Sequence, residues 1–485
     1  MNKKILLSTI TSLAICSTAL NAISLDEEIK QLKQTIQQQQ IQIDELKSST
    51  EDIDEIDERL EEVEIRSFTD KINLGLGMRV EMNNYSNTYA NGTSYDANEI
   101  YRTKLNINMK SKISDNLKFS GKLSMYKNWG DSTARNTNYD SMQGRKPDSN
   151  ALYVERAYLD WTLNPNSTVP VTLTMGRQPS SDGPSYQIKE DTSRKGTYDA
   201  LAADGAADGL VLTANLNKIS KGTSLRLAYG TPNVLDNEAY TSEQMNYNGK
   251  DKDSFENTKV LGLFVDQTIS SFDFENLIQA YYMDASNMNA NPQVLDIDSS
   301  STTFMQNQDI NVGDFALSGF MIEGSKISNK FDAFFHYSRS EAKPNGELAY
   351  LGSMGSHGLL TSIDGDTSIK SGDAIWLGTR YHINKKYKIG LEYNKGSQNW
   401  FSFTSGANDP LNKLATRGDA LELYITRIIN KNANIRLGYV DINYEYTGSG
   451  NHLGSTMKIS TLPDSYKAST IEQTSNMYLT FNLLF

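Results

Sequence analysis

Apolar residues follow two different periods along this chain. Between residues 23 and 67 they recur at alternating spacings of four and three, as at Leu25, Ile29, Leu32 and Ile36. From residue 68 to residue 485 alternation dominates, and every second residue of 72–82 is apolar. The first pattern predicts an α-helical coiled coil, and the second predicts β-strands with one apolar face.

The N-terminal heptads favour the association of several helices. The residues between the apolar positions are mostly Gln, Glu, Asp and Lys, although Gln39 and Thr50 occupy two core positions. A single helix has no partner against which to bury the apolar seam. About forty helical residues would extend roughly 60 Å. A lone, highly charged helix is the alternative interpretation of 23–67.

The alternating region contains about sixteen predicted strands. Short turns such as 114–115, 164–166 and 430–432 alternate with long polar loops rich in Gly and Asn, which is typical of outer-membrane barrels. An even number of strands would place both barrel ends in the periplasm. The predicted strands are 71–83, 99–113, 116–127, 151–164, 168–178, 208–217, 223–231, 257–268, 271–285, 312–326, 330–342, 372–384, 387–398, 417–430, 433–447 and 472–485.

Composition fits a closed transmembrane barrel better than a bundle of spanning helices. Only 38% of the residues are hydrophobic, and the mean hydropathy is −0.52. Barrel strands expose only alternate residues to lipid, so a low average is expected. The terminal strand 477–485 ends on Phe485, which is typical of barrels inserted by the outer-membrane assembly machinery. The predicted fold class is therefore an all-β antiparallel transmembrane barrel, 68–485, preceded by a coiled coil.

Residues 1–22 have the features of a secretory signal peptide. Lys3 and Lys4 precede an apolar stretch, and small residues lie near Ala22. A membrane anchor and a lipidation site at Cys16 are the alternatives. Cys16 is the only cysteine, so the mature chain would contain no disulfide. We expect the barrel in a bacterial outer membrane and the coiled coil in the periplasm.

Aromatic residues lie near many predicted strand ends. The chain has 26 tyrosines, and amphipathic rings at the headgroup level form girdles around membrane barrels. The general enrichment of aromatics in strands is the other explanation. The residues concerned are Tyr101, Trp129, Tyr153, Trp161, Tyr229, Tyr381, Tyr387 and Tyr439.

The third long loop, 179–207, follows a strand that ends Gly176-Arg177-Gln178. This strand end resembles the porin superfamily, in which it leads into a loop that folds inward and narrows the pore. More narrowly, the chain resembles a porin-like outer-membrane family known only as a domain of unknown function. The resemblance implies an outer-membrane channel and implies no substrate. It rests on 117–129, 153–161, 176–184, 196–209 and 390–400.

Charged residues define a candidate pore constriction. Acids on the inward-folding loop would face bases on the wall, and opposed charges would create a transverse field that favours polar solutes. Alternatively, the bases pair with wall acids such as Glu81, Asp160, Glu392 and Glu422, or the loop stays outside as a lid that holds calcium or bridges lipopolysaccharide. The loop residues are Asp182, Lys189, Glu190, Asp191, Arg194, Lys195, Asp199 and Asp204, and the basic wall residues are Arg79, Arg102, Lys104, Lys110, Lys118, Lys122, Arg156 and Arg226.

The sequence shows no pattern typical of an enzyme or a resident cofactor. Its four histidines are not spaced as a metal pair, and 355–358 lacks the nucleophile elbow of a hydrolase. A Ser and a His that the fold brings together would not be visible at this level. Loop acids at 296–298 and 364–366 could take part in calcium sites, but solvated loop acids are the preferred explanation. The net charge of −12 gives no indication of nucleic-acid binding.

These observations predict a porin, a water-filled channel for passive diffusion of small hydrophilic or charged solutes. The porin resemblance implies a homotrimer, and the coiled coil would serve as a spacer close to peptidoglycan. A substrate-specific channel, for example for an organic acid, is a narrower alternative. A non-conducting anchor or adhesin, with a plugged barrel that links the cell wall to the surface, is the alternative from a different class.

Overall fold

The computed structural model describes residues 30, 33–42, 72–129, 149–205, 207–231, 258–271, 274–290, 310–327, 330–350, 355–404 and 409–484. The chain divides into two units, Met1–Lys71 and Ile72–Phe485. In the first unit residues 33–42 are helical, and Ile36 is exposed. The predicted signal peptide 1–22 and most of the predicted coiled coil 23–67 lie outside the described residues, so both stay predictions.

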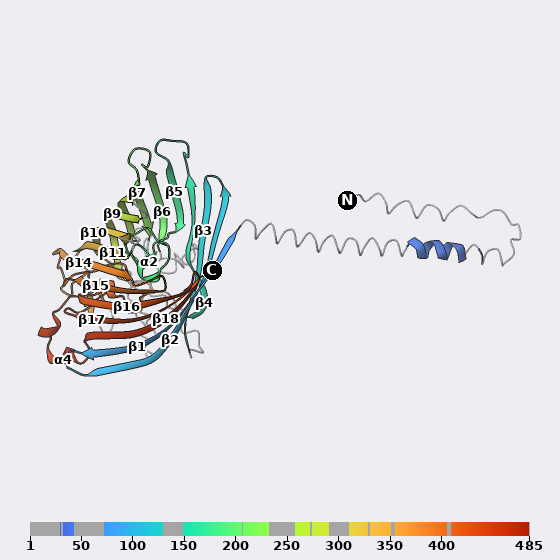
Figure 1. Ribbon diagram of the computed structural model, residues 1–485. Coiled ribbons are helices and arrows are strands. Elements are labelled where there is room, and N and C mark those ends of the chain that lie inside the picture. The colour runs from blue at the N-terminus through green and yellow to red at the C-terminus, as the bar shows by residue number, and fades with distance from the viewer. Residues whose placement is uncertain are drawn as a thin grey trace, which may run out of the picture. The chain divides into compact units, whose positions relative to one another are not determined.

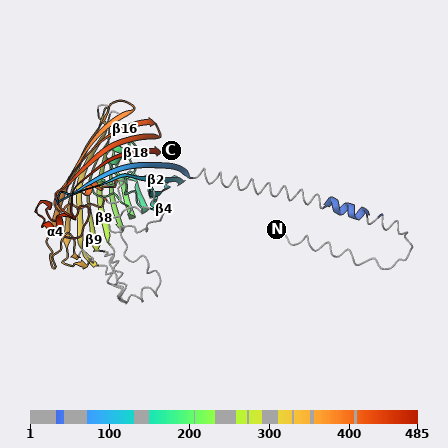
Figure 2. The ribbon, with the colours of Figure 1, turned by 90° about the horizontal axis from the view of Figure 1, so that it is seen from below.

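The second unit is a closed antiparallel barrel of 16 strands, which confirms the predicted barrel and its strand count (Figure 1, Figure 2). Sequential strands are neighbours, and β18 closes the barrel against β1, with Val80 opposite Phe481. A closed sheet pairs its backbone groups without an exposed edge. The barrel strands are β1 (Asn73–Tyr89), β2 (Ser94–Ser114), β3 (Leu117–Asn128), β4 (Ser149–Thr162), β5 (Val171–Arg177), β6 (Asp208–Asn215), β7 (Thr223–Thr231), β8 (Lys259–Ser271), β9 (Phe274–Ala290), β10 (Ile310–Ile327), β11 (Phe331–Pro344), β14 (Lys370–His382), β15 (Tyr387–Gly396), β16 (Gly418–Asn430), β17 (Ala433–Tyr444) and β18 (Ile471–Leu484).

Short elements occupy some of the connections. Strands β12 (Ala349–Tyr350) and β13 (Ser356–His357) form a separate two-stranded sheet. The helical turns are α2 (Tyr186–Glu190), η3 (Lys413–Ala415), η4 (Ile459–Thr461) and α4 (Asp464–Lys467). No helix in the described ranges is long and apolar enough to cross a membrane.

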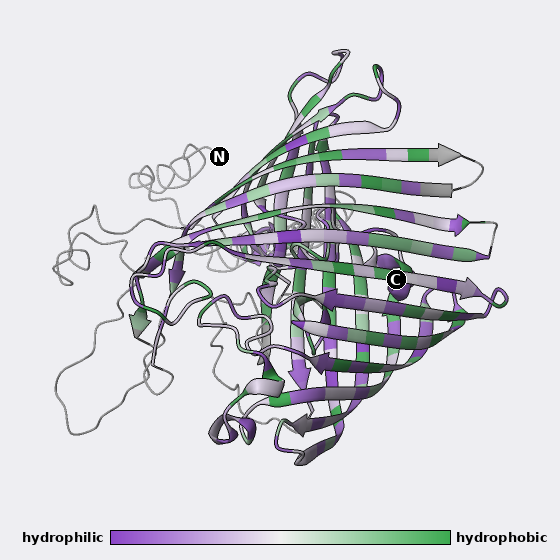
Figure 3. Ribbon diagram, turned by 90° about the vertical axis from the view of Figure 1, so that its left-hand side faces the viewer, coloured by the Kyte–Doolittle hydropathy of each residue, from purple (hydrophilic) through white to green (hydrophobic). Residues whose placement is uncertain are grey.

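Alternation along each strand separates two faces of the barrel wall. In β16, Leu421, Leu423 and Ile425 are exposed on the outside, whereas Glu422 and Tyr424 between them are buried. Figure 3 shows the resulting bands of apolar and polar residues along neighbouring strands. The outer face is thus an apolar belt, as hydrocarbon contact requires.

The first hairpin extends beyond its predicted ends. β1 continues from residue 83 to Tyr89, and β2 begins at Ser94 rather than at residue 99, so only a four-residue turn joins them. Asn87 pairs with Tyr95 and Thr88 pairs with Ser94 in this extension. The apolar alternation ends with the belt, but backbone pairing does not depend on lipid contact and therefore continues past it.

Candidate functional site

The loop between β5 and β6, described at 178–205 and 207, lies inside the barrel. We call it the internal loop. Its side chains contact inward-facing residues on distant strands, among them Glu323 on β10, Glu422 on β16 and Arg436 on β17. Figure 1 accordingly shows α2, which belongs to this loop, within the outline of the barrel.

Glycines allow the two arms of the internal loop to lie against each other. A Cβ on Gly183 would lie 2.0 Å from the Tyr198 carbonyl oxygen, and a Cβ on Gly196 would lie 2.7 Å from the Ser181 carbonyl oxygen. The Gly196 N–H donates to the Asp182 carbonyl oxygen at 3.1 Å. Any larger residue at either position would push the arms apart.

The internal loop packs on an apolar patch of the inner wall, which the sequence analysis did not expect. Ile188 and Leu201 of the loop belong to one buried cluster with wall residues such as Phe264, Leu317 and Trp376. The predicted water-filled interior therefore does not extend to the part of β8–β11 and β14 that this cluster covers. A loop inside a barrel needs apolar partners to offset the entropy lost when it is ordered.

Ion pairs fix the α2 segment of the loop to the wall. Lys189 Nζ lies 3.1 Å from Glu422, and Glu190 binds both Arg79 and Arg436, the latter at 2.9 Å. Burial lowers the pKa of Lys189, and the neighbouring Glu422 carboxylate, which acts in the opposite direction, does not offset this effect. These contacts join one short helix to strands on both sides of the β1–β18 closure.

Asp191 provides a second attachment at the end of α2. It adopts a left-handed backbone conformation with φ 56°, and its carboxylate binds Arg380 at 2.8 Å and also Lys388. Burial raises the pKa of Asp191, but these two cations outweigh burial and hold it below its usual value. The carboxylate is therefore ionised at neutral pH.

The opposite arm of the loop meets the basic wall of β3 and β4. Asp182 lies 3.2 Å from Lys122 and 3.8 Å from Arg156, and Lys122 also binds Glu155 at 2.8 Å. The Lys195 side chain retains exposed surface. Desolvation by the surrounding protein lowers its pKa to about 8, opposed by Asp182 and assisted by Lys122.

A Ser–His–Asp arrangement lies between the loop and β11. Ser185 Oγ is 2.9 Å from His336 Nε2, and His336 Nδ1 is 2.6 Å from Asp199. These side chains are at most 1% exposed, and Ser185 donates its proton to Glu323 at 3.0 Å. A serine that donates its proton to a carboxylate is not activated by the histidine in this arrangement. This geometry holds the loop to the wall, while the lack of enzymatic activity stays a prediction.

A second loop between β15 and β16, described at 397–404 and 409–417, also enters the barrel. We call it the bracing loop. Its Phe403 N–H donates to Ala202 at 3.0 Å, and its Phe403 carbonyl accepts from Asp204 N–H at 2.8 Å. Lys413 of this loop binds Glu392 at 2.6 Å and Glu422. The bracing loop therefore holds the internal loop through backbone hydrogen bonds to Ala202 and Asp204.

Two polar cavities remain beside the internal loop, along β1–β3 and β16–β18. The inner cavity, of about 810 Å³ including the space open to solvent, reaches the short turn at 430–434. The outer cavity, of about 540 Å³ on the same measure, reaches Asp409 and Pro410 of the bracing loop. Both are lined by Arg79, Asp182 and Glu190. They meet at this trio, where ion pairs join the loop to the wall.

The two cavities differ in the charge of their linings. Acids outnumber bases in the outer cavity, where Glu81, Asp409 and Glu422 add to the shared residues. Bases outnumber acids in the inner cavity, where Lys104, Lys122 and Lys195 contribute. The excess charge of the lining residues therefore changes sign from the outer cavity to the inner cavity.

The structure places six of the eight basic wall residues on the inner face with acidic or carbonyl partners. Arg102 pairs with Glu81 at 2.9 Å, and Arg226 pairs with Asp266 at 2.7 Å. Lys110 and Lys118 are exposed on parts of β2 and β3 close to a short turn, away from the junction of the cavities. Asp199 and Asp204 are buried on the far arm of the loop. Phe485 lies outside the described residues.

Several charged residues of the site were not predicted. The alternation that found Arg79 and Arg102 continues on later strands, and would have found Arg380, Lys388 and Arg436. Glu323 follows the apolar residues 320–322 and Asp332 lies among the apolar residues 331–335, which is a comparable signal. The bracing loop carries Trp400, Phe401 and Phe403, an apolar run unusual for a solvated loop.

Only some of the loop acids predicted to bind calcium lie among the described residues. Among the described residues, no three His, Cys, Asp or Glu side chains cluster as a metal site. Asp366, one of the proposed calcium acids, instead accepts from Ser368 and Thr361. The acids at 296–298 lie outside the described residues, and loop calcium stays a prediction.

Comparison with known sequences identifies the family. Residues 94–485 match the sequence profile described as Protein of unknown function (DUF3373). The chain belongs to the DUF3373 family. This confirms the resemblance inferred from the sequence, and it shows that the match covers all but the first barrel strand and the N-terminal unit. The comparison with curated proteins finds no match.

Solved barrels resemble this DUF3373 protein in fold. Salmonella typhi OmpF in complex with daunomycin is 12% identical, with 86% of this chain and 99% of that chain covered and a TM-score of 0.45. Pseudomonas putida OprB at high pH is 10% identical, with 87% and 96% covered and a TM-score of 0.48. A loop-deletion variant of Vibrio cholerae OmpT is 14% identical, with 85% and 99% covered and a TM-score of 0.41.

Proposed function

We propose that this DUF3373 protein is an outer-membrane porin with a narrow, charge-lined passage for small hydrophilic solutes. The passage runs through the outer and inner cavities and is interrupted where Arg79, Asp182 and Glu190 meet. The single observation that carries the proposal is the pair of polar cavities that share these three residues and lead toward opposite ends of the barrel. The apolar outer belt supports the membrane location.

The transverse-field mechanism takes a modified form in this proposal. Acids and bases at the junction are in direct contact rather than separated across an open gap. The passage therefore conducts when the Arg79–Glu190 contact opens. An entering ion exchanges part of its hydration shell for contacts with these charged groups. The excess of acidic residues in the outer cavity and of basic residues in the inner cavity sets the preference of the passage for cations or anions. No specific solute follows from this lining.

Cysteine accessibility tests the route directly. Cys16 lies in the predicted signal peptide, so single cysteines can be introduced into a mature chain without another thiol. Pro410→Cys samples the outer cavity, Asn434→Cys samples the inner cavity, and Leu423→Cys on the exposed outer face is the matched control. A charged methanethiosulfonate reagent should reduce bilayer current in both cavity variants and leave the control unchanged.

The same experiment separates a porin from a plugged anchor. The packing of the internal and bracing loops favours the anchor as the second candidate, because these loops occupy part of the barrel interior beside β8–β11 and β14. Current without any effect of reagent at either cavity would place the route elsewhere. Folded protein that carries no current would favour the anchor.

Homotrimerisation remains part of the proposal, and cross-linking of the full chain tests it.

A further inference from the structure

The inner cavity has more positive charge in its lining than its acids offset. Two of these acids, Glu190 and Asp191, are each bound by two bases of the wall, among them Arg436 on β17 and Arg380 on β14. Neither acid therefore offsets the charge of the lysines that line the cavity. The sign of the lining alone names no solute, but the partners of each base narrow the class of molecule that the cavity binds.

Three bases beside the inner cavity share two acids. Lys122 lies 2.8 Å from Glu155 and 3.2 Å from Asp182. Lys104 lies 3.8 Å from the same glutamate. Arg156 lies 3.8 Å from the same aspartate. All five side chains are buried, so water screens their charges weakly. Within this group of described residues, the bases exceed the acids by one.

Lys195 of the internal loop adds a further positive charge. Its side chain lines the inner cavity and retains exposed surface. Among the described residues, no group forms a hydrogen bond or an ion pair with its ammonium. An anion that enters the cavity can therefore bind Lys195 without breaking an existing ion pair. Together with the group above, the described bases on the loop side of the cavity exceed the acids by two.

The turn end of the inner cavity combines apolar surface with another base. Ile428 and Leu484 line the cavity beside the short turn at 430–434, and Lys431 lines it from the turn itself. Positive charge therefore lies both at the loop and at the turn, with apolar side chains in the same lining. This pattern fits an anion that carries two charges on a short hydrocarbon segment better than it fits a bare inorganic ion.

The size of the inner cavity limits such an anion to a few carbons. The volume that is open to the centres of water-sized molecules is about 160 Å³. A cavity of about 150 Å³ holds a benzene molecule, so the inner cavity accommodates roughly six to eight non-hydrogen atoms. A dicarboxylate of about four carbons fills this volume, whereas a phosphate or sulfate ion leaves part of it unfilled.

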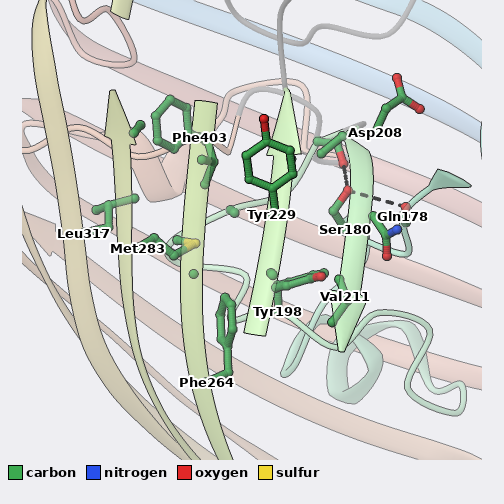
Figure 4. A pocket seen from close by; sticks show the side chains of 18 of the residues that line it. Gln178, Ser180, Tyr198, Asp208, Val211, Tyr229, Phe264, Met283, Leu317 and Phe403 are labelled. Carbon is green, nitrogen blue, oxygen red and sulfur yellow. Dashed lines mark hydrogen bonds between the residues drawn. The ribbon is translucent and has the colours of Figure 1, made fainter. Parts of the chain in front are cut away.

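The apolar pocket between the internal loop and strands β6–β10 offers an anion no comparable contacts. Its lining includes Phe264, Met283 and Leu317 (Figure 4). The described residues that line it include no lysine, arginine or histidine, and its Asp208 is paired with Arg177 at 3.1 Å. We therefore expect anions to bind in the inner cavity and not in this pocket.

We propose that the inner cavity binds a dicarboxylate of about four carbons, with one carboxylate beside Lys195 and the other toward Lys431. The hydrocarbon segment lies against Ile428 and Leu484. This inference deepens the function proposed above, and it rests on that proposal for passage of the solute across the membrane. Binding itself requires no current, so the two are tested separately.

Protection of an introduced cysteine tests the site without any measurement of current. Asn434→Cys samples the inner cavity, and Pro410→Cys in the outer cavity is the matched control. The full protein in detergent micelles is treated with a small neutral methanethiosulfonate at pH 7, with and without succinate, and mass spectrometry follows modification of the introduced cysteine. Succinate should slow modification of Asn434→Cys at least fivefold and saturably, and should change that of Pro410→Cys less than twofold.

A lysine substitution in the Asn434→Cys protein tests the role of Lys195. Lys195→Met keeps a long side chain without the charge, and should remove most of the protection by succinate. Lys221→Met, the same change at an exposed lysine on another short turn that does not line the cavity, should retain it. Heat-dependent gel mobility reports folding of each variant. Protection that is unchanged in folded Lys195→Met would overturn the site.

The pH dependence of protection gives a readout that needs no change at Lys195. Desolvation lowers the pKa of Lys195 to about 8, with Asp182 acting to raise it and Lys122, Arg79 and Arg156 acting to lower it. The ammonium is thus mostly charged at pH 7 and mostly neutral at pH 9. Protection, taken as the ratio of the rates without and with succinate, should fall severalfold between these values. The ratio cancels the change in the thiolate fraction of the cysteine.

Two other anions test the class of ligand. Equal protection by sulfate would mean that charge alone is recognised, and equal protection by butyrate would mean that the second carboxylate contributes nothing. Either result would overturn the dicarboxylate assignment. Current through a protein that succinate does not protect would overturn the site and leave the porin proposal standing. Protection in a folded protein that carries no current would support the site and contradict the porin.

Discussion

The bridge that Glu190 makes between Arg79 and Arg436 predicts how the passage opens. The Glu190 side chain is only 12% exposed, and it lies where the outer and inner cavities meet. Glu190→Gln keeps the shape of the side chain but removes its charge. The amide would weaken one charge-assisted hydrogen bond to each guanidinium, so the loop should leave the wall more readily.

The size of the effect follows from two such bonds. A hydrogen bond to a charged group contributes about 1.5–3 kcal/mol. Two bonds at the lower value give about 3 kcal/mol, which corresponds to roughly 150-fold in the ratio of open to closed passages. The amide oxygen partly replaces the lost hydrogen bonds and so reduces this effect. We therefore expect the ratio of open to closed passages to rise at least tenfold.

Single-channel recording in planar bilayers measures the open fraction. Glu190→Gln should show longer or more frequent openings than the wild type, and a shift toward anions because one acid has left the junction. Asp464→Asn, the same carboxylate-to-amide change at a side chain that is 96% exposed on α4, is the control. An open fraction in Glu190→Gln that stays within twofold of wild type and control would refute the gating role of this bridge.

Three further predictions address other parts of the barrel. Lys195, with its pKa lowered to about 8, should lose its charge between pH 7 and 9, so the reversal potential should move toward cation preference there in the wild type and stay flat in Lys195→Met. Burial lowers the pKa of His452 from its ordinary value near 6.5 to about 4. The buried neutral imidazole therefore stabilises the fold fully above pH 6.5, and this stabilisation is lost as the pH falls toward 4. Thermal melts should show a loss of up to about 3 kcal/mol over that range, reduced in His452→Asn but not in His357→Asn; equal slopes would contradict the assignment. Trp400→Ala should lower the free energy of unfolding by about 3–5 kcal/mol, measured in urea, because Trp400 is fully buried, whereas the same change at exposed Trp161 should cost far less.

Much of the barrel wall could be predicted from the sequence because lipid imposes a strict alternation. Residues such as Leu421 and Leu423 must face hydrocarbon, so their neighbours must face inward, and this placed Arg79 and Arg102 as well as the sixteen strands. The limits of β1 and β2 could not be placed this way, because their outer ends lie beyond the apolar belt.

The interior was harder to predict because contacts there join residues far apart in sequence. Nothing near Ser185 in the chain indicates that it would meet His336, and nothing near Phe403 indicates pairing with Ala203. The apolar inner face of β8–β10 made those strands the least regular in sequence. Its cause became clear only with the internal loop in place, since Ile188 and Leu201 pack in the same buried cluster as that face.

Conductance of the full-length protein in a planar bilayer tests the central claim most directly. The account predicts discrete current steps that a charged thiol reagent blocks in Pro410→Cys and in Asn434→Cys but not in Leu423→Cys. Folded, heat-modifiable barrels that insert and carry no current, including the Glu190→Gln variant, would contradict it.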